Sequence, residues 1–158
     1  MNKQRKIALL AVTAMLAGCG SATDAVTFKP PAGFMSSVSV GPFMQAWSGP
    51  NQSMLMLMAM PTKIDLQHTI SNSTVSNADI EKQMRITICG NQEALYADMV
   101  GNPQGNKTPA PGAKEQKERI EFLATTVSGK TYMAMYLRPL GTPPDPQAES
   151  AIRNVCPK

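Results

Sequence analysis

Hydrophobic and polar positions divide the chain into short segments, most of which have the pattern of β-strands. Short apolar runs at 26–28, 37–40 and 43–47 predict three strands, separated by turns that contain proline and glycine. Residues 53–60 form an almost unbroken apolar run that ends at Pro61. Such a run is typical of a strand that is buried on both faces or covered by a helix layer, so we place it in the middle of a sheet.

The second half of the chain contains the clearest hairpin. Residues 118–127 and 130–137 alternate or are apolar, and Ser128-Gly129 joins them as a two-residue turn in which glycine tolerates a positive φ. Residues 93–100 predict a further strand. Residues 101–117 contain three prolines and three glycines and predict a long loop, which we take as a candidate interaction segment.

A helix is predicted just before residue 90. Ser76-Asn77-Ala78-Asp79 has the form of a capping box, and apolar residues then recur every fourth position at Ile80, Met84 and Ile88. This spacing places one apolar stripe on the core, and Cys89-Gly90 would end the helix.

A second helix is predicted near residue 150. Asp145 and Pro146 suit its N-cap and first position. Its buried stripe would consist of Ala148, Ala151, Ile152 and Val155, and Pro157 would stop it. Strands, a helix, a hairpin and a final helix predict a single α+β domain over 26–158, an antiparallel β-sheet with two or so packed helices.

The first nineteen residues have the order of a secretory signal peptide. Lys3, Arg5 and Lys6 precede an apolar run at 7–18, which is too short to span a bilayer because a dozen helical residues cover only about 18 Å. The following Leu16-Ala17-Gly18-Cys19 resembles the bacterial lipobox. The resemblance implies a lipoprotein signal peptide at 1–18, a lipidated Cys19 and a tether over 19–25. A plain secretory signal with a chance cysteine is the alternative.

Lipidation would define where the mature protein lies. Two or three acyl chains of the palmitate type anchor a protein stably without a membrane span. Gly20, in place of an aspartate after the cysteine, resembles the pattern of lipoproteins sorted to the outer membrane, facing the periplasm. Removing 1–18 removes three of fifteen Lys and Arg and none of eleven acids, so the formal charge falls from +4 to +1. We therefore expect no nucleic-acid binding.

Composition indicates a globular domain with an aliphatic core. Apolar residues make up 42% of the 158 residues and charged residues only 16%, which argues against a disordered or coiled-coil chain. Aromatic residues make up 5%, whereas methionine occurs 12 times, so thioethers should fill much of the core.

The two remaining cysteines predict one disulfide. In an oxidising compartment, Cys89 and Cys156 would form a pair. The alternative is a reactive Cys89 with His68, the only histidine, as its base. A single histidine and two cysteines supply too few ligands for a zinc site of the usual kind.

Two short motifs near the ends of the predicted domain suggest a family. Residues Thr27-Phe28-Lys29-Pro30-Pro31-Ala32-Gly33-Phe34 are similar, with one extra residue, to the Phe-x-x-Pro-x-Gly-aromatic opening of the PsbP-like family. The hairpin Gly129-Lys130-Thr131-Tyr132 leading to a terminal amphipathic helix also resembles that family. The resemblance implies a PsbP-like fold and a mainly non-catalytic role in assembly or binding, with no binding residue transferred.

Methionines at alternate positions are the candidate metal ligands. A strand would place each of two sets on one face, and thioethers suit Cu(I). The sets are Met54, Met56, Met58 and Met60, and Met133 and Met135. Alternate side chains on one strand lie about 6 to 7 Å apart, so a site would need a neighbouring strand. A core packed with methionine is the alternative, which the interleaved leucines favour.

Other candidate groups indicate packing rather than chemistry. Tyr132 and Tyr136 share a strand face with Ala134 between them. This gap admits a ligand or, as we favour, a packed helix, and Trp47 and Tyr96 are further candidates to line the same cleft. Acids at 115, 118 and 121 suggest a solvated face. No nucleophile, base and orienting group can be assembled. We therefore expect a lipid-anchored, non-catalytic binding or assembly module without a cofactor, whose partner is an envelope protein, with a Met-based Cu(I) carrier as the alternative.

Overall fold

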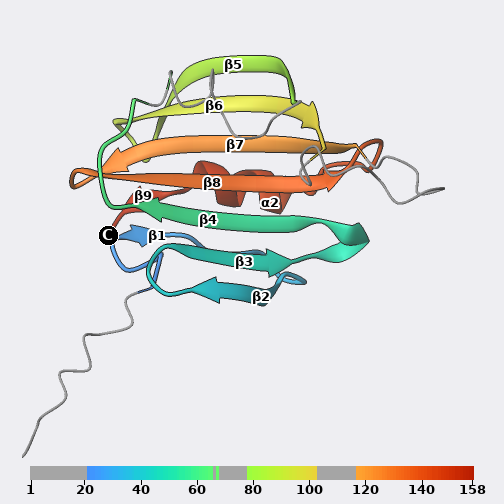
Figure 1. Cartoon of the computed structure of the whole chain (residues 1–158), viewed down its shortest axis with the longest axis horizontal. Helices are drawn as coiled ribbons and strands as arrows, with labels where there is room; N and C mark the ends of the chain where they lie inside the picture. Colours follow the sequence, from blue (N-terminus) through green and yellow to red (C-terminus); the bar gives the residue numbers. More distant parts are fainter. Residues whose placement is uncertain (1–20, 66, 68–77, 103–116) are drawn as a thin grey trace, which may run out of the picture.

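The computed structural model describes residues 21–65, 67, 78–102 and 117–158 (Figure 1). Its strands are β1 (Val26–Thr27), β2 (Met35–Val40), β3 (Met44–Ser48), β4 (Met54–Met60), β5 (Asp79–Ile88), β6 (Gln92–Gly101), β7 (Glu118–Val127), β8 (Lys130–Pro139) and β9 (Cys156–Pro157). A 3-10 turn, η1 (Pro50–Gln52), follows β3, and helix α2 (Pro146–Arg153) follows β8.

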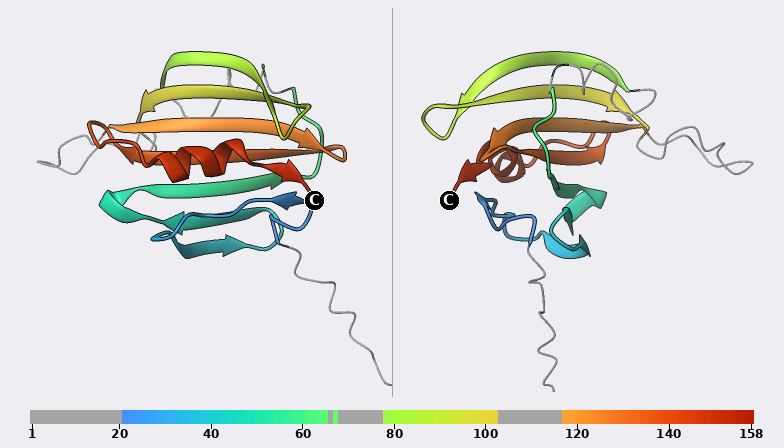
Figure 2. Two further views of the ribbon diagram at one scale, coloured as in Figure 1. Left: turned by 180° about the vertical axis from the view of Figure 1, so that it is seen from behind. Right: turned by 60° about the vertical axis from the view of Figure 1, so that its left-hand side comes forward.

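Seven strands form one antiparallel sheet in the order β2-β3-β4-β8-β7-β6-β5, and β1 pairs with β9 in a small second sheet. Helix α2 lies across one face of the large sheet, against β7 and β8 (Figure 2). The α+β class predicted from the sequence is therefore confirmed. Among the described residues one helix, α2, packs on the sheet, fewer than the two or so predicted, because the first predicted helix is a strand.

The segment predicted as that helix is β5, which pairs along its length with β6. The prediction was wrong because a spacing of four is an even number, so it fits one face of a strand as well as one face of a helix. Met84 and Ile88 do share a face of the sheet, whereas a bulge between Ile80 and Lys82 turns Ile80 to the other face. Cys89 and Gly90, both with positive φ, lie in the β5–β6 turn rather than at a helix end. Ser76 and Asn77 of the proposed capping box lie outside the described residues.

The β7–β8 hairpin and strand β6 agree with the sequence prediction. Ser128 and Gly129 both have positive φ, at 50° and 76°, which suits the right-handed twist of the flanking strands. The apolar run at 53–60 is the internal strand β4, between β3 and β8, although the central position of the sheet belongs to β8. Its side chains alternate: Leu55 and Leu57 are fully buried, whereas Met54, Met56 and Met58 are half-buried.

The two faces of the sheet carry separate hydrophobic clusters. On the α2 face, Leu55, Leu57 and Leu123 pack with Ile152 of the helix. On the other face, which we call the face opposite α2, Met99, Ile120, Phe122 and Met133 form a second buried cluster, against which Ile64 packs. The Ile64 amide donates a hydrogen bond to Thr131 Oγ1 at 3.0 Å, so the chain after β4 crosses this face.

Helix α2 begins and packs as the sequence predicts. The Asp145 carboxylate accepts hydrogen bonds from the amides of Gln147 and Ala148, and Pro146 occupies the first turn. Its buried residues are Ala148, Ala151 and Ile152, and Val155 is buried just after its end.

The described part of the predicted tether, 21–25, packs against the domain. Ala22 is only 1% exposed and belongs to the cluster under α2. No helix in the described part of the chain is long and apolar enough to cross a membrane. Most of the predicted interaction loop, residues 103–116, lies outside the described residues.

Candidate functional site

Strand β2 is one edge of the large sheet, and all six of its residues are exposed. Met35, Val38 and Val40 point to the face opposite α2, since their partners on β3 continue the rows of Met54, Met56 and Met58. The strand has no charged residue, and a bulge between Ser36 and Val38 is followed by regular pairing to Val40. Within the part of the chain that the structure describes, only β3 pairs with it. Its outer backbone groups can therefore accept another strand.

The opposite edge, β5, is protected by charge. It carries Asp79, Glu81, Lys82 and Arg85. Arg85 forms an ion pair with Glu93, and Glu81 accepts a hydrogen bond from Arg119 at 2.8 Å. Charged side chains on an edge strand oppose pairing with a second chain. The two edges thus differ in chemistry, and we call β2 the docking edge.

Next to the docking edge, the face opposite α2 is rich in methionine. Strand pairing places Met56 opposite Met135 on β8, and Met58 between Met133 on β8 and Met44 on β3. We call these five residues the methionine face. The other two candidates lie at its margins, since Met54 faces Leu137 and Met60 faces Thr131.

The methionine face brings thioether side chains closer together than a single strand can. Cross-strand neighbours have Cβ atoms about 4.5 to 5.5 Å apart, closer than alternate residues along one strand. Met44 was not a sequence candidate, because its contribution depends on β3 pairing in register with β4. Among the described residues, no three His, Cys, Asp or Glu side chains gather in a way that could hold a metal ion.

The predicted tyrosine cleft is filled. Tyr132 and Tyr136 share the α2 face with Ala134, as predicted, but they are only 3% and 2% exposed. The Tyr136 hydroxyl accepts a hydrogen bond from the Asp145 amide at 3.1 Å, which ties it to the start of α2. Trp47 packs on Phe28, with ring centroids 5.1 Å apart. These rings belong to the packed core.

A buried ionic cluster lies under the end of α2. Glu121 on β7 is 2% exposed and accepts hydrogen bonds from Tyr96 at 2.9 Å and from Arg138 at 3.2 Å. Arg153 of α2 lies over the Tyr96 ring, 4.9 Å from its centroid, and 3.9 Å from the Glu121 carboxylate. The prediction of a solvated acidic face was therefore wrong for Glu121. Glu115 lies outside the described residues.

Burial controls the titration of this cluster. It raises the pKa of Glu121, while the Tyr96 hydrogen bond partly counters the effect. Burial, together with the adjacent Glu121, also raises the pKa of Tyr96 to about 12. The carboxylate is compensated by two arginines and a phenol, so the cluster joins sheet to helix and is not arranged as an acid–base pair at an open surface.

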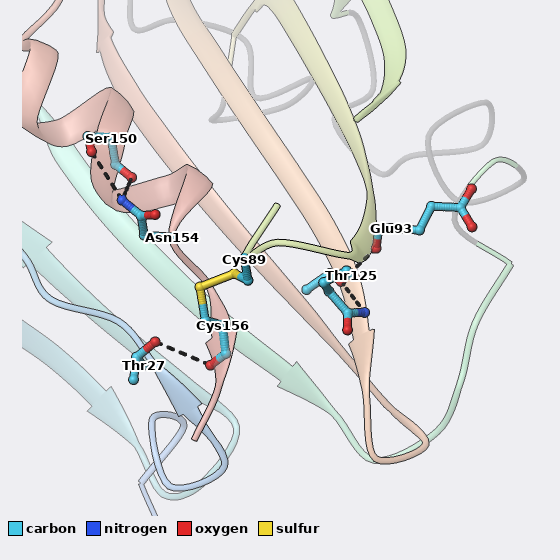
Figure 3. Close-up of a disulfide and its surroundings, with 8 residues drawn as sticks. Thr27, Cys89, Glu93, Thr125, Ser150, Asn154 and Cys156 are labelled. Carbon is cyan, nitrogen blue, oxygen red and sulfur yellow. Dashed lines mark hydrogen bonds between the residues drawn. A yellow bond between two sulfur atoms is a disulfide. The ribbon is translucent and has the colours of Figure 1, made fainter. Parts of the chain in front are cut away.

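The cysteines Cys89 and Cys156 are joined in a disulfide with Cα atoms 5.6 Å apart (Figure 3). The bond links the β5–β6 turn to β9, just after α2. The Thr27 hydroxyl donates a hydrogen bond to the Cys156 carbonyl at 3.3 Å, so β1 is held at the same place. A bonded Cys89 is not a nucleophile. His68 lies outside the described residues.

One further hollow opens near the turn end of β5 and β6. Arg85, Gln92, Glu93 and Thr126 line it. The polar groups of these four residues are largely paired: Arg85 binds Glu93, and the Gln92 amide donates to Thr125 Oγ1 and to the Thr126 carbonyl. This hollow offers no convergent set of free polar groups among the residues described.

Comparison with known proteins gives likeness in fold. No family model and no curated protein matches the sequence. Among solved structures, a Pseudomonas aeruginosa protein of unknown function, described as a putative regulator, has a TM-score of 0.53 at 12% identity over 85% of this chain and 98% of its own. The Ran-binding protein Mog1 of Saccharomyces cerevisiae has a TM-score of 0.50 at 12% identity over 73% of this chain and 72% of its own. A Mog1 variant has a TM-score of 0.50 at 14% identity, over 84% and 80%. The domain thus has a fold similar to Mog1.

Proposed function

We propose that this protein is a lipid-anchored bacterial envelope protein whose domain binds a partner protein without catalysis, through the docking edge. The observation that carries the proposal is the contrast between the two sheet edges. Strand β2 is exposed and uncharged, whereas β5 carries four charged residues. A sheet that protects one edge and leaves the other open is suited to strand addition there.

The chemistry of β2 defines the partner segment. An added strand would take its affinity from backbone hydrogen bonds and its specificity from the side chains on the two sheet faces. On the face opposite α2 these side chains are Met35, Val38 and Val40, and β2 carries no charge that would select for a charged segment. The partner segment should therefore be extended and apolar on one face.

Two further lines support a binding role. Mog1 is a Ran-binding protein, so a domain of this fold can bind another protein. The motif at 27–34 resembles the opening of the PsbP-like family, which is mainly non-catalytic, and we retain membership of that family as part of the proposal. The resemblance of residues 16–19 to a lipobox supports anchoring through Cys19, and Gly20 after it supports a place at the outer membrane, facing the periplasm.

A matched pair of edge substitutions tests the docking edge. Val38 is 46% exposed on β2, and Ile80 is 42% exposed on β5. We expect Val38→Lys to abolish a specific cross-link to an envelope partner in intact cells and Ile80→Lys to leave it unchanged. Purified variants should unfold at the same temperature as the native protein. Equal capture by both variants would contradict the docking edge as the binding site.

The anchor has its own test. Mass spectrometry of the mature protein should find Cys19 as the first residue, carrying a diacylglyceryl group. A mature chain beginning elsewhere, or an unmodified Cys19, would contradict lipid anchoring while leaving the docking edge to its own experiment.

Cu(I) binding at the methionine face is the second candidate. The observation that favours it is the register that brings Met44, Met56 and Met58 beside Met133 and Met135. Soft thioethers on three adjacent strands suit Cu(I). Anaerobic titration with Cu(I) should then saturate at one equivalent and weaken at least tenfold in Met58→Leu, with the marginal Met54→Leu as control. Absence of saturable binding tighter than micromolar would end this candidate.

A further inference from the structure

The chain reaches the domain at one fixed place. Ser21 donates hydrogen bonds from its hydroxyl to Gln45 Oε1 on β3, at 3.0 Å, and from its amide to Asp24 Oδ2, at 2.7 Å. Ala22 follows in the core, 1% exposed. The beginning of the described chain is therefore fastened beside β3, next to the docking edge.

An exposed apolar group lies at the same end of the sheet. Val40, Pro42 and Phe43 form the β2–β3 turn region, and Met60 ends β4 beside it; we call these four residues the apolar tip. Phe43 is 55% exposed and Val40 50%. Phe43 and Met60 line the same hollow as Ser21. Figure 1 shows the β2–β3 turn and the start of the coloured chain at the end where the C-terminus also lies.

Covalent geometry places the proposed anchor at this tip. Cys19 is two residues before Ser21, so its Cα lies within about 7 Å of Ser21. If residues 19–25 formed a tether without contacts to the domain, they would span up to about 25 Å and let the domain rotate freely relative to the membrane. Because Ser21 and Ala22 are held, acyl chains on Cys19 would bring this end of the sheet to the membrane surface.

The charges around the tip suit a lipid headgroup boundary. Residues 40–44 carry none. Of the two charged side chains that line the hollow, Asp24 accepts the hydrogen bond from Ser21, and Lys130 is exposed. Apolar side chains such as phenylalanine, with lysine or arginine nearby, are typical of segments that lie in the membrane interface.

We propose that the apolar tip inserts into the bilayer interface next to the lipidated Cys19, so that the membrane orients the domain with β2 rising from the surface. This inference rests on the lipid anchor of the proposed function. It adds a second membrane contact, made by side chains, which would hold the docking edge in one orientation toward partners in the periplasm.

The test measures depth in the membrane at two matched positions. Leu140 is 48% exposed and follows β8 at the opposite end from Lys130, so it is the control for Phe43. Each would be replaced by a spin-labelled cysteine, Phe43→Cys or Leu140→Cys, in the mature lipidated protein reconstituted in vesicles of phosphatidylcholine and phosphatidylglycerol. Thermal unfolding would verify that both labelled proteins fold.

We expect the label at 43 to collide several-fold less with a water-soluble relaxant, and more with oxygen, than the label at 140. If the water-soluble relaxant reaches both labels equally on an acylated protein, the membrane contact of the tip is overturned, whereas the lipid anchor is retained. If the water-soluble relaxant reaches the label at 43 in vesicles but not in cells, the membrane contact is overturned and the tip is assigned to a protein partner. Absence of acyl chains on Cys19 would overturn the lipid anchor and the membrane contact of the tip together, and would leave the docking edge to its own experiment.

Discussion

The Tyr96 hydroxyl on β6 donates a 2.9 Å hydrogen bond to the Glu121 carboxylate on β7, beneath the last turn of α2. Glu121 also contacts Arg138 on β8 and lies 3.9 Å from Arg153 on the helix. One buried carboxylate thus connects three strands and the helix. Removing one partner of a buried charged group strongly destabilises a protein, because the remaining charge is left uncompensated. Substitutions in this cluster therefore test the structure sensitively.

Tyr96→Phe should destabilise the domain at neutral pH. It removes a hydrogen bond to a buried, charged acceptor, which typically costs about 1 to 3 kcal/mol. Urea denaturation would measure the loss. The same substitution in a Glu121→Gln background should cost less, because the two effects are coupled. Equal costs in both backgrounds would contradict the contact.

The pH dependence of stability should change in Glu121→Gln. Burial raises the folded-state pKa of Glu121, so its contribution to stability is fully present below its unfolded pKa, near 4.5, and is lost as pH rises through the folded pKa. The stability of the variant relative to that of the native protein should therefore rise as the pH increases above about 4.5. Denaturation at several pH values measures this, with the exposed Glu93→Gln as control. If the stability difference between the variant and the native protein does not change with pH, or changes in the opposite direction, Glu121 does not have a raised pKa in the folded state.

Gly49→Ala should destabilise the domain although its backbone is extended. A Cβ atom at Gly49 would lie 2.3 Å from Cε1 of Phe34, whose ring packs edge-on against Tyr136. Overpacking of this kind costs about 1 to 3 kcal/mol. Phe34→Leu should relieve the clash, so the double variant should lose less than the sum of the single losses. Additive losses, measured by urea denaturation, would argue against this contact.

The disulfide should protect the fold strongly. It closes a sequence separation of 67 residues between Cys89 and Cys156. In the chain-entropy model such a loop corresponds to about 4 kcal/mol, a large part of the stability of a small domain. Replacing both cysteines with alanine should lower stability by a similar amount. The native mature protein should show no free thiol under denaturing, non-reducing conditions, and two free thiols would contradict the bridge.

Asp145→Ala should loosen the start of α2. The carboxylate accepts from the Gln147 amide at 2.8 Å and the Ala148 amide at 3.4 Å, and the loss of such a cap costs about 1 kcal/mol. Asp145→Asn retains an acceptor oxygen and should cost much less. Chemical denaturation compares the two, and equal losses would show that the cap is not what stabilises this end.

Local sequence patterns were enough to predict several elements of the fold. The Ser128-Gly129 turn fixed the β7–β8 hairpin, and Asp145-Pro146 fixed the start of α2, because each depends on backbone geometry within a few residues. The same sequence favoured a helix at β5. Ile80, Met84 and Ile88 have a spacing that both structures allow, and pairing with β6 decided between them.

The sequence by itself determined the α+β class, the Ser128-Gly129 hairpin and the N-cap of α2, because these depend on periodicity and on residues close together in the chain. Tertiary structure alone decided the features on which the proposals rest: the contrast between β2 and β5 as edges, the burial of Glu121 and the joining of Met44 to the other methionines. It also fastened Ser21 to Gln45 on β3. These features depend on which distant segments pair and in what register, and a shift of one residue would turn each side chain to the other face.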